Sequence, residues 1–280
     1  MIAVTGAREL RNLIQEFVRS YANQPGTKNW WRDPLLATAR IDERFDVLPN
    51  IASDDHLLPT DLLPGARSLI VFFIPFTKEL IEENTIGPFP CRNWGLAYEA
   101  TNELIGLICE RIKNVLAVQG YMSAITPATH NFDEIKLMAK WSHKHLAHLS
   151  GLGRIGMNAQ LITPAGCAGR LGSLVTEADL GDAPLVTEDE LCLHKRGEEC
   201  LECFDRCPIQ ALGEEGIDRQ KCWERLKYNL ENTEQLVGLQ DSTHVCGKCV
   251  VGLPCSYSTC ISEIFRHSLS SRKRSQHGAP

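Results

Sequence analysis

Residues 197–212, GEECLECFDRCPIQAL, constrain this chain more than any other stretch. Cys200, Cys203 and Cys207 follow the spacing C-x2-C-x3-C, and a proline comes directly after the third of them. This is most of the run C-x2-C-x2-C-x3-C-P with which bacterial ferredoxins bind iron–sulfur clusters, and Gly197 stands where its first cysteine would be. Further ligands must therefore come from other parts of the chain.

Other cysteines of the last third can complete two clusters. Eight of the twelve cysteines lie between residues 192 and 255. In two-cluster ferredoxins, the cysteine before proline ligates the other cluster. We therefore predict two 4Fe–4S clusters, one held by Cys192, Cys200, Cys203 and Cys255 and the other by Cys207, Cys222, Cys246 and Cys249. Zinc is the alternative, because C-x2-C pairs also form zinc ribbons.

Composition narrows the setting in which these cysteines work. The first twenty residues carry charges every few positions and contain no uninterrupted apolar segment, so we expect neither a secretion signal nor a membrane span. Clustered cysteines in a cytoplasmic chain of this length bind metal or do redox chemistry more often than they form disulfides. The net charge of −6 argues against a nucleic-acid partner. We predict a cytoplasmic protein.

The pattern of apolar residues indicates alternating helices and strands up to about residue 180. We predict helices over 8–20, 100–121 and 134–149, a buried strand within 61–76, and shorter strands at 121–126, 159–164 and 172–180. Cysteine-bearing loops follow. The sequence thus predicts a first domain at 1–186, a cluster-binding domain at 187–262 and a disordered basic tail at 263–280.

The segment GLGRIG, residues 151–156, matches the dinucleotide-binding pattern G-x-G-x-x-G as text. Dinucleotide binding requires the glycines to follow a strand and to open a helix. Here a predicted helix precedes Gly151 and a predicted strand follows Asn158, so the order is reversed. Two interpretations stay open: a helix end followed by a turn, or a loop for a different cofactor.

Several cysteines and histidines fall outside the cluster pattern. Cys109 lies in a helical apolar stripe and is expected in the core, whereas Cys91 and Cys167 are expected in loops of the first domain. Cys167 stands between small residues, where backbone could approach a ligand. His145 is first a core-facing histidine; a metal role shared with His148 and a cofactor contact are the alternatives.

Five stretches together resemble one family. DLLPGARSLIVFFIPF, WGLAYEATNELIGLI, GLGRIGMNAQLITP, GRLGSLVTEADL and the eight-cysteine frame are similar to epoxyqueuosine reductases and, more distantly, to the catalytic subunits of reductive dehalogenases. The resemblance implies an α+β protein: a nitroreductase-like α/β domain that binds cobalamin, followed by a ferredoxin-like domain with two 4Fe–4S clusters. Electrons would come from a low-potential donor of the ferredoxin or flavodoxin type and pass through the clusters to the corrinoid.

The resemblance also implies site residues. The cobalamin contacts would be Gly151, Gly153, Gly156, Asn158, Arg170, Gly172 and Ser173. The candidates for proton transfer and catalysis are Asp133, His143, His145 and Cys167.

The sequence departs from the family pattern at the catalytic acid. Epoxyqueuosine reductases carry an acid 14 residues before the first glycine of the turn, where this chain has Leu137. The last cysteine of the frame follows a proline instead of preceding one. We therefore expect an iron–sulfur, cobalamin-dependent oxidoreductase that does not act on tRNA. The alternatives are a protein that reduces or carries corrinoids without an organic substrate of its own, and a flavin (FMN) enzyme on the same scaffold.

Overall fold

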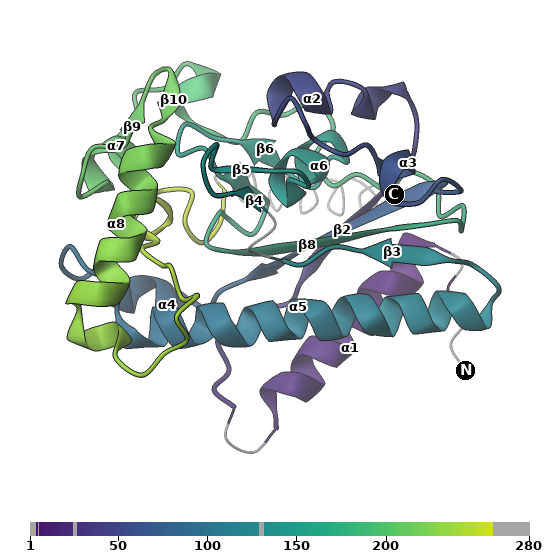
Figure 1. Cartoon of the computed structure of the whole chain (residues 1–280), viewed down its shortest axis with the longest axis horizontal. Coiled ribbons are helices and arrows are strands. Elements are labelled where there is room, and N and C mark those ends of the chain that lie inside the picture. The colour runs from purple at the N-terminus through teal and green to yellow at the C-terminus, as the bar shows by residue number, and fades with distance from the viewer. Residues whose placement is uncertain (1–3, 5, 25–26, 129–131, 260–280) are drawn as a thin grey trace, which may run out of the picture.

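The computed structural model describes residues 4, 6–24, 27–128 and 132–259. The tail predicted at 263–280 lies outside them. A mixed structure of helices and strands results, as the sequence predicted (Figure 1). No helix in the described part of the chain is both long and apolar enough to cross a membrane.

A four-stranded antiparallel sheet forms the centre of the first part of the chain. Its strand order is β1–β2–β8–β3, and the bounds are Leu35–Arg40 for β1, Ser68–Pro75 for β2, Ser123–Ile125 for β3 and Gly169–Thr176 for β8. Phe72 of β2 pairs with Leu36 on one side and with Gly172 on the other. The strand predicted within 61–76 is therefore confirmed as a central strand, and the strand predicted at 172–180 begins three residues earlier than expected.

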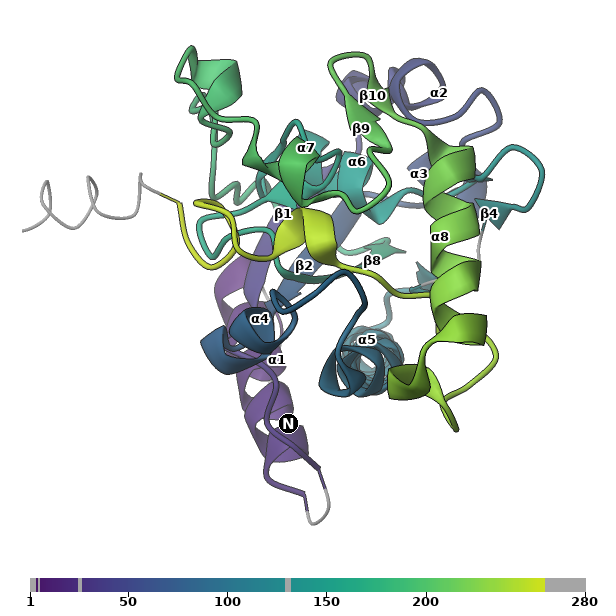
Figure 2. The same cartoon turned by 90° about the vertical axis from the view of Figure 1, so that its left-hand side faces the viewer.

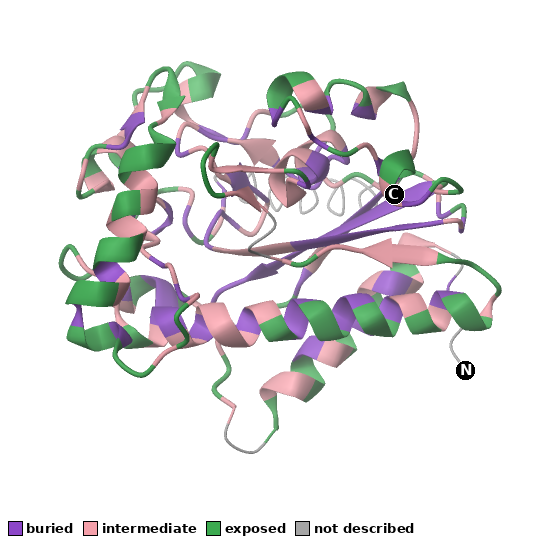
Figure 3. Cartoon of the chain, in the orientation of Figure 1, coloured by how far each residue is buried: buried purple, intermediate pink, exposed green. Residues whose placement is uncertain are grey.

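Both faces of β2 are covered, and all eight of its residues are buried (Figure 3). Because side chains alternate along a strand, Ile70, Phe72 and Ile74 join one apolar cluster and Leu69, Val71 and Phe73 the other. The first cluster is completed by α1 (Ala7–Ala22) and α5 (Arg92–Val118). The second includes residues of α6 (His143–Leu149) and lies on the opposite face. Each buried large side chain stabilises the fold by about 1.5–3 kcal/mol.

The long helix α5 begins beside the cysteine-bearing segment and then runs along the sheet (Figure 1). Its apolar stripe includes Leu104, Ile108 and Cys109, as predicted. The helix ends at Val118, and Gly120 adopts the left-handed conformation (φ 87°) expected of a stop signal. It begins eight residues earlier than predicted because Trp94 and Ala97 of its first turns are themselves buried.

The helix predicted at 134–149 is wrong in its first half. Residues 132–139 form a hairpin of β4 (Phe132–Asp133) and β5 (Met138–Ala139), and α6 starts only at His143. The side chain of Asp133 accepts hydrogen bonds from the backbone N–H groups of Ile135 (2.8 Å) and Lys136 (2.7 Å). Such an acceptor offers the backbone an alternative to helical hydrogen bonds, so the turn replaces the helix.

The cysteine-bearing segment packs beside one end of the sheet and beside the start of α5 (Figure 2). It contains α7 (Glu202–Arg206), the hairpin of β9 (Leu212–Gly213) and β10 (Gly216–Ile217), and α8 (Arg219–Asn232). Asp218 caps α8 by accepting a hydrogen bond from the backbone N–H of Lys221. Leu191, Leu236 and Val251 join the same apolar cluster as α1 and α5.

Short elements connect these parts. Beside β6 (Arg154–Ile155) and β7 (Leu161–Ile162), which form a hairpin, they are α2 (Leu48–Ile51), α3 (Pro59–Leu62), α4 (Lys78–Glu83) and the 3-10 turns η1 (Glu43–Phe45), η2 (His194–Arg196), η3 (Glu234–Leu236) and η4 (Lys248–Val250). The predicted order of a helix, a glycine turn and then a strand is confirmed around residues 149–162.

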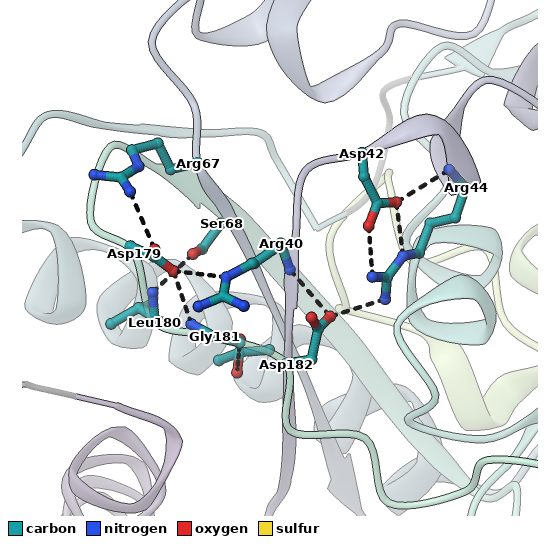
Figure 4. Close-up of polar contacts among 10 residues, drawn as sticks. Arg40, Asp42, Arg44, Arg67, Ser68, Asp179, Leu180, Gly181 and Asp182 are labelled. Carbon is teal, nitrogen blue, oxygen red and sulfur yellow. Dashed lines mark hydrogen bonds and ion pairs between the residues drawn. The ribbon is translucent and has the colours of Figure 1, made fainter.

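Ion pairs fasten the segment after β8 to the edge of the sheet (Figure 4). Asp179 pairs with Arg40 (3.1 Å) and Arg67 (3.0 Å), and Asp182 pairs with Arg44 (2.8 Å). Exposed pairs of this kind contribute roughly 0–1 kcal/mol each. Their value here is positional, because they fix the chain where it leaves the sheet toward the cysteine-bearing segment.

Candidate functional site

The structure gathers the eight predicted ligands into the two predicted groups. Cys192, Cys200, Cys203 and Cys255, the first cysteine set, line one small cavity together with Asn158 and Glu202. Cys200 lies just before α7 and Cys203 in its first turn, while Cys192 and Cys255 approach from segments more than 60 residues apart in sequence. Distant parts of the chain thus converge on one place.

The second cysteine set consists of Cys207, Cys222, Cys246 and Cys249. These four line a separate cavity of about 290 Å³, which we call the cluster cavity, together with Trp94, Tyr98 and Arg170 from the first part of the chain. Cys207 ends α7, Cys222 lies in the first turn of α8, and the other two flank Gly247 and Lys248. The cysteine before proline therefore lies with the second set although its sequence neighbours belong to the first.

The thiols within each set raise the pKa values of their neighbours. Burial, followed by the charges of Cys255, Cys192 and Cys200, raises the pKa of Cys203 to about 11. Burial, followed by Cys246 and Cys207, raises the pKa of Cys222 to about 11 as well. A positive centre bound among such thiols would remove this repulsion and favour the thiolate form, which is the form that ligates metal.

Within the described residues, no group of three or more His, Cys, Asp or Glu side chains is arranged to hold a metal ion. Ligation by the eight cysteines stays a prediction.

Asn158 and Cys167 lie between the two sets. The side-chain amide of Asn158 donates to the backbone carbonyl of Cys249 (3.2 Å) and lies 3.5 Å from the sulfur of Cys167. The sulfur of Cys167 is 3.9 Å from that of Cys255. Both residues are buried, so these predicted site residues contact the cysteine sets themselves.

A second cavity of about 300 Å³, which we call the outer cavity, adjoins the cluster cavity. The two share Tyr98, Arg170, Cys222 and three further lining residues. The outer cavity also has aromatic and apolar walls from Phe132, Leu137 and Trp223, and a second cation, Arg219. Its size is at the lower end of the range for small-molecule sites.

Arg170 faces both cavities. Its guanidinium lies over the ring of Tyr98, 4.3 Å from the centroid. The Nε atom is buried and has no hydrogen-bond partner among the described residues. A buried donor without a partner is costly, so Arg170 is the predicted contact residue whose surroundings best fit a bound ligand.

The glycines predicted to contact cobalamin lie against the protein itself. A side chain at Gly151 would meet Pro184, and one at Gly153 would meet the carbonyl group of Ile162. A side chain at Gly156 would also meet Ile162, and one at Gly172 would meet Phe72. Internal packing therefore accounts for these four glycines, and their contact with a cofactor stays a prediction without structural support.

His143 and Ser173 belong to one hydrogen-bond chain. The indole N–H of Trp141 donates to the hydroxyl of Ser173 (3.0 Å), and that hydroxyl donates to Nδ1 of His143 (2.8 Å). Nε2–H of His143 donates to the carbonyl of Pro127 (3.1 Å). Burial lowers the pKa of His143 to about 4. Its hydrogen bonds hold a neutral ring, and neither His143 nor Ser173 lines the cluster cavity or the outer cavity.

His145 is held in a similar way. Nδ1 lies 2.7 Å from the hydroxyl of Ser142, and burial, aided by the charge of Lys144, lowers the pKa to about 3. This fits the core-facing interpretation. A catalytic role for either histidine stays a prediction.

Asp133 and Leu137 have different positions in the β4–β5 hairpin. Two backbone hydrogen bonds lower the pKa of Asp133, and this residue lines neither cavity. Leu137 lines the outer cavity and has a left-handed backbone (φ 54°). The position at which the resemblance implied an acid therefore lines a cavity, but with an apolar side chain.

Sequence reasoning missed the residues of the first turns of α5 and the cations near the second set. Trp94 and Tyr98 line the cluster cavity, as do Lys248 and Arg225. A signal existed for the aromatic pair: both follow Cys91 in a segment that continues N-terminally from the apolar stripe. For Lys248, the signal was its place inside the C-x2-C pair of Cys246 and Cys249.

No family model and no curated protein matches this sequence. Solved structures do match. A crystal structure of selenomethionine-labelled epoxyqueuosine reductase aligns over 89% of this chain and 66% of its own, with 14% identity and a TM-score of 0.52. An epoxyqueuosine reductase bound to a modified tRNA stem loop aligns over 90% of this chain and 71% of its own, with 13% identity and a TM-score of 0.48. Another, from Bacillus subtilis, aligns over 84% and 68%, with 14% identity and a TM-score of 0.44.

The likeness extends over nearly all of this chain, which spans slightly less than two thirds of the first of those structures. At this level of identity it concerns the fold, and it agrees with the resemblance expected from the sequence motifs. The chain has the fold of the epoxyqueuosine reductases.

Proposed function

We propose that this protein is an iron–sulfur oxidoreductase that passes electrons through two 4Fe–4S clusters to an acceptor in the outer cavity. One observation carries the proposal: eight cysteines form two sets of four, and Cys222 of the second set also lines the outer cavity. Such an arrangement suits stepwise electron delivery to a bound molecule.

The residues present fit the clusters by their chemistry. Each set offers four soft thiolate donors, which iron–sulfur clusters require. The walls add apolar groups, including Leu253 and Ile162 at the first set and Leu212 and Val250 at the second. Limited access of water protects such clusters and influences their potentials.

The acceptor that we propose is a corrinoid. A corrinoid is larger than the outer cavity of about 300 Å³, so Arg170 and Tyr98 would contact only part of it. The fold supports this choice, and so does the unpartnered Nε of Arg170. When bound, a corrinoid supplies a cobalt centre that can take up electrons and carry out reductive chemistry. The chain's own contribution is to orient that group: Arg170 donates hydrogen bonds, while Phe132 and Trp223 form an aromatic wall.

We propose a substrate other than tRNA. Leu137 cannot donate a proton, and Asp133 is occupied in its turn and lines neither cavity. The chain's net charge of −6 also disfavours a polyanion. The electron donor in this proposal is a low-potential carrier of the ferredoxin or flavodoxin type, and the location is the cytoplasm. The division into domains at 1–186 and 187–262 is likewise proposed.

A second candidate function has support from the lining of the outer cavity. Its described lining residues include no Asp or Glu. A protein that only reduces or carries a corrinoid needs no acid for an organic substrate. Corrinoid reduction or transport is therefore the second function that we propose. A flavin acceptor on the same scaffold is the third.

The test is an anaerobic reconstitution with iron, cobalt and flavin assays beside the absorption spectrum. We expect about eight irons per chain and a cobalamin spectrum that changes when the protein is added. Four irons or fewer together with stoichiometric zinc would overturn the cluster assignment. A spectral and thermal response to FMN but not to cobalamin would replace the corrinoid by a flavin. Full iron and a cobalt that cycles without turnover of any reducible substrate would favour the carrier function.

A further inference from the structure

The two cysteine sets lie in opposite electrostatic surroundings. Apart from its cysteines, the first set's cavity has one charged lining side chain among the described residues, the carboxylate of Glu202. The cluster cavity around the second set is lined by Arg170, Arg225 and Lys248, with no Asp or Glu among the described lining residues. Two sites built from the same ligands thus differ in the sign of the charge beside them.

The contacts of the cations hold them in place. Lys248 is buried, and its ammonium group donates to the backbone carbonyls of Asn84 (2.6 Å) and Ile86 (3.1 Å). Arg225 donates to the carbonyl of Pro88 (2.7 Å) and lies over the ring of Phe89. In neither case is the cation neutralised by a carboxylate in these contacts, so its charge can act on Cys246.

Other charged groups near the two sets do not reverse this difference in charge. Asp218 faces Cys222, but so does Lys144, which is of opposite charge. Glu190 adds a second carboxylate to the first set, where it accepts a hydrogen bond from the backbone N–H of Cys192 (2.9 Å). The thiol of Cys167, 3.9 Å from the sulfur of Cys255, can donate a hydrogen bond to it and then acts in the opposite direction, but a thiol is a weak donor and carries no net charge.

Reduction adds negative charge to a cluster, so nearby cations stabilise the reduced form and nearby carboxylates destabilise it. We infer that the cluster on the second set has the higher reduction potential of the two. The inference rests on the proposed clusters. In a half-reduced protein, the electron then resides beside the outer cavity, and the charge distribution directs electrons from the first set toward the acceptor. Asn158, which contacts the first set's cavity and Cys249, lies between the two sets.

The experiment is a redox titration of the anaerobically reconstituted protein, followed by electron paramagnetic resonance. Cys203→Ser and Cys222→Ser identify which signal belongs to which set. We expect the first electron to appear on the second set's cluster. Arg225→Gln should shift the electron distribution toward the first set by about tenfold, or about 59 mV for a one-electron couple, while Arg225→Lys should restore it. Glu202→Gln should raise the potential of the first set's cluster.

Lys113→Gln is the matched control, because it removes a partly exposed positive charge on α5 that lines neither cavity and should leave both potentials unchanged. A first electron on the first set's cluster would overturn the inference. So would a distribution in Arg225→Gln equal to that of the wild type, measured at full iron content. A wild-type protein that binds no 4Fe–4S clusters would instead contradict the proposed function, and iron analysis separates these results.

Discussion

Histidine protonation links the fold to pH at the residue scale. The pKa values of His143 and His145 are lowered to about 4 and about 3, chiefly by burial. The unfolded chain binds protons at these residues below about pH 6.5, whereas the folded protein remains neutral there. The free energy of unfolding is therefore fully retained above about pH 6.5 and falls as the pH drops toward the two folded values.

We predict that urea unfolding curves will show this loss between about pH 6.5 and pH 4. In the double variant with His143→Gln and His145→Gln, the dependence on pH should flatten, and stability at neutral pH should drop because hydrogen bonds of the rings are lost. An unchanged pH dependence in the double variant would assign the effect to other groups.

Two glycines allow a comparison at the same scale. An alanine at Gly153 would press its Cβ against the carbonyl of Ile162, whereas the Cβ at Gly106 in α5 would meet no atom within 4 Å. We expect Gly153→Ala to destabilise the protein by about 1–3 kcal/mol. Gly106→Ala should stabilise it by up to about 1 kcal/mol, because alanine favours a helix interior.

Thermal unfolding without any added cofactor measures both changes. A stable Gly153→Ala protein that had lost only cobalamin binding would restore the cofactor-loop interpretation of GLGRIG. The sequence could not decide between these readings, since a glycine required by packing and one required by a ligand have the same letter.

At the scale of elements, the hairpin of β4 and β5 shows where periodicity misleads. Met138, Trp141, His145 and Leu149 have helical spacing, yet only the last two lie in α6. Trp141 is buried, and it donates a hydrogen bond to Ser173 of β8, which lies 32 positions further along the chain. Apolar spacing predicted β2 and α5 well because their burial follows one regular stripe or run. It failed here because tertiary contacts bury residues of a turn.

Asp133 is the residue that holds this hairpin turn, and its removal gives a test. We predict that Asp133→Ala will accelerate amide hydrogen exchange at Ile135 and Lys136, whose N–H groups lose their acceptor. Each lost hydrogen bond contributes about 0.5–1.5 kcal/mol locally. Exposed Glu134 provides the control: Glu134→Ala should leave both exchange rates close to those of the wild type. Equal rates in Asp133→Ala and wild type would mean that the turn does not depend on this carboxylate.

At the scale of the whole molecule, the cysteine frame was the most predictable part of the site. Ligand spacing and the crossover rule assigned eight cysteines to two sets, and each set lines one cavity, while ligation by these cysteines stays a prediction. The outer cavity could not be predicted in this way. Its walls come from α5, the β4–β5 hairpin, β8 and α8, and no local pattern records that these elements meet.

The net negative charge of the molecule and the apolar Leu137 in the wall of the outer cavity predict that the protein does not act on tRNA. We expect no efficient conversion of epoxyqueuosine-containing tRNA under anaerobic conditions with a strong reductant and cobalamin. General acid catalysis contributes typically 10²–10⁴-fold, and Leu137 cannot supply it. Leu137→Asp places a carboxyl group at this wall and is the informative variant. Efficient turnover by the wild-type protein would show that another proton donor replaces the missing acid.

The position of Cys207 in the second set predicts which cluster its substitution impairs. Cys203 and Cys207 are one helical turn apart in and after α7, yet they lie in different cavities. Cys207→Ser should therefore impair the cluster of the second set and leave the other largely intact, while Cys200→Ser should do the reverse. Iron content and the resonance signal of each cluster distinguish the two variants. If both substitutions damaged the same cluster, the ligands would follow the order of the sequence, and the convergence of distant segments on each set would have another cause.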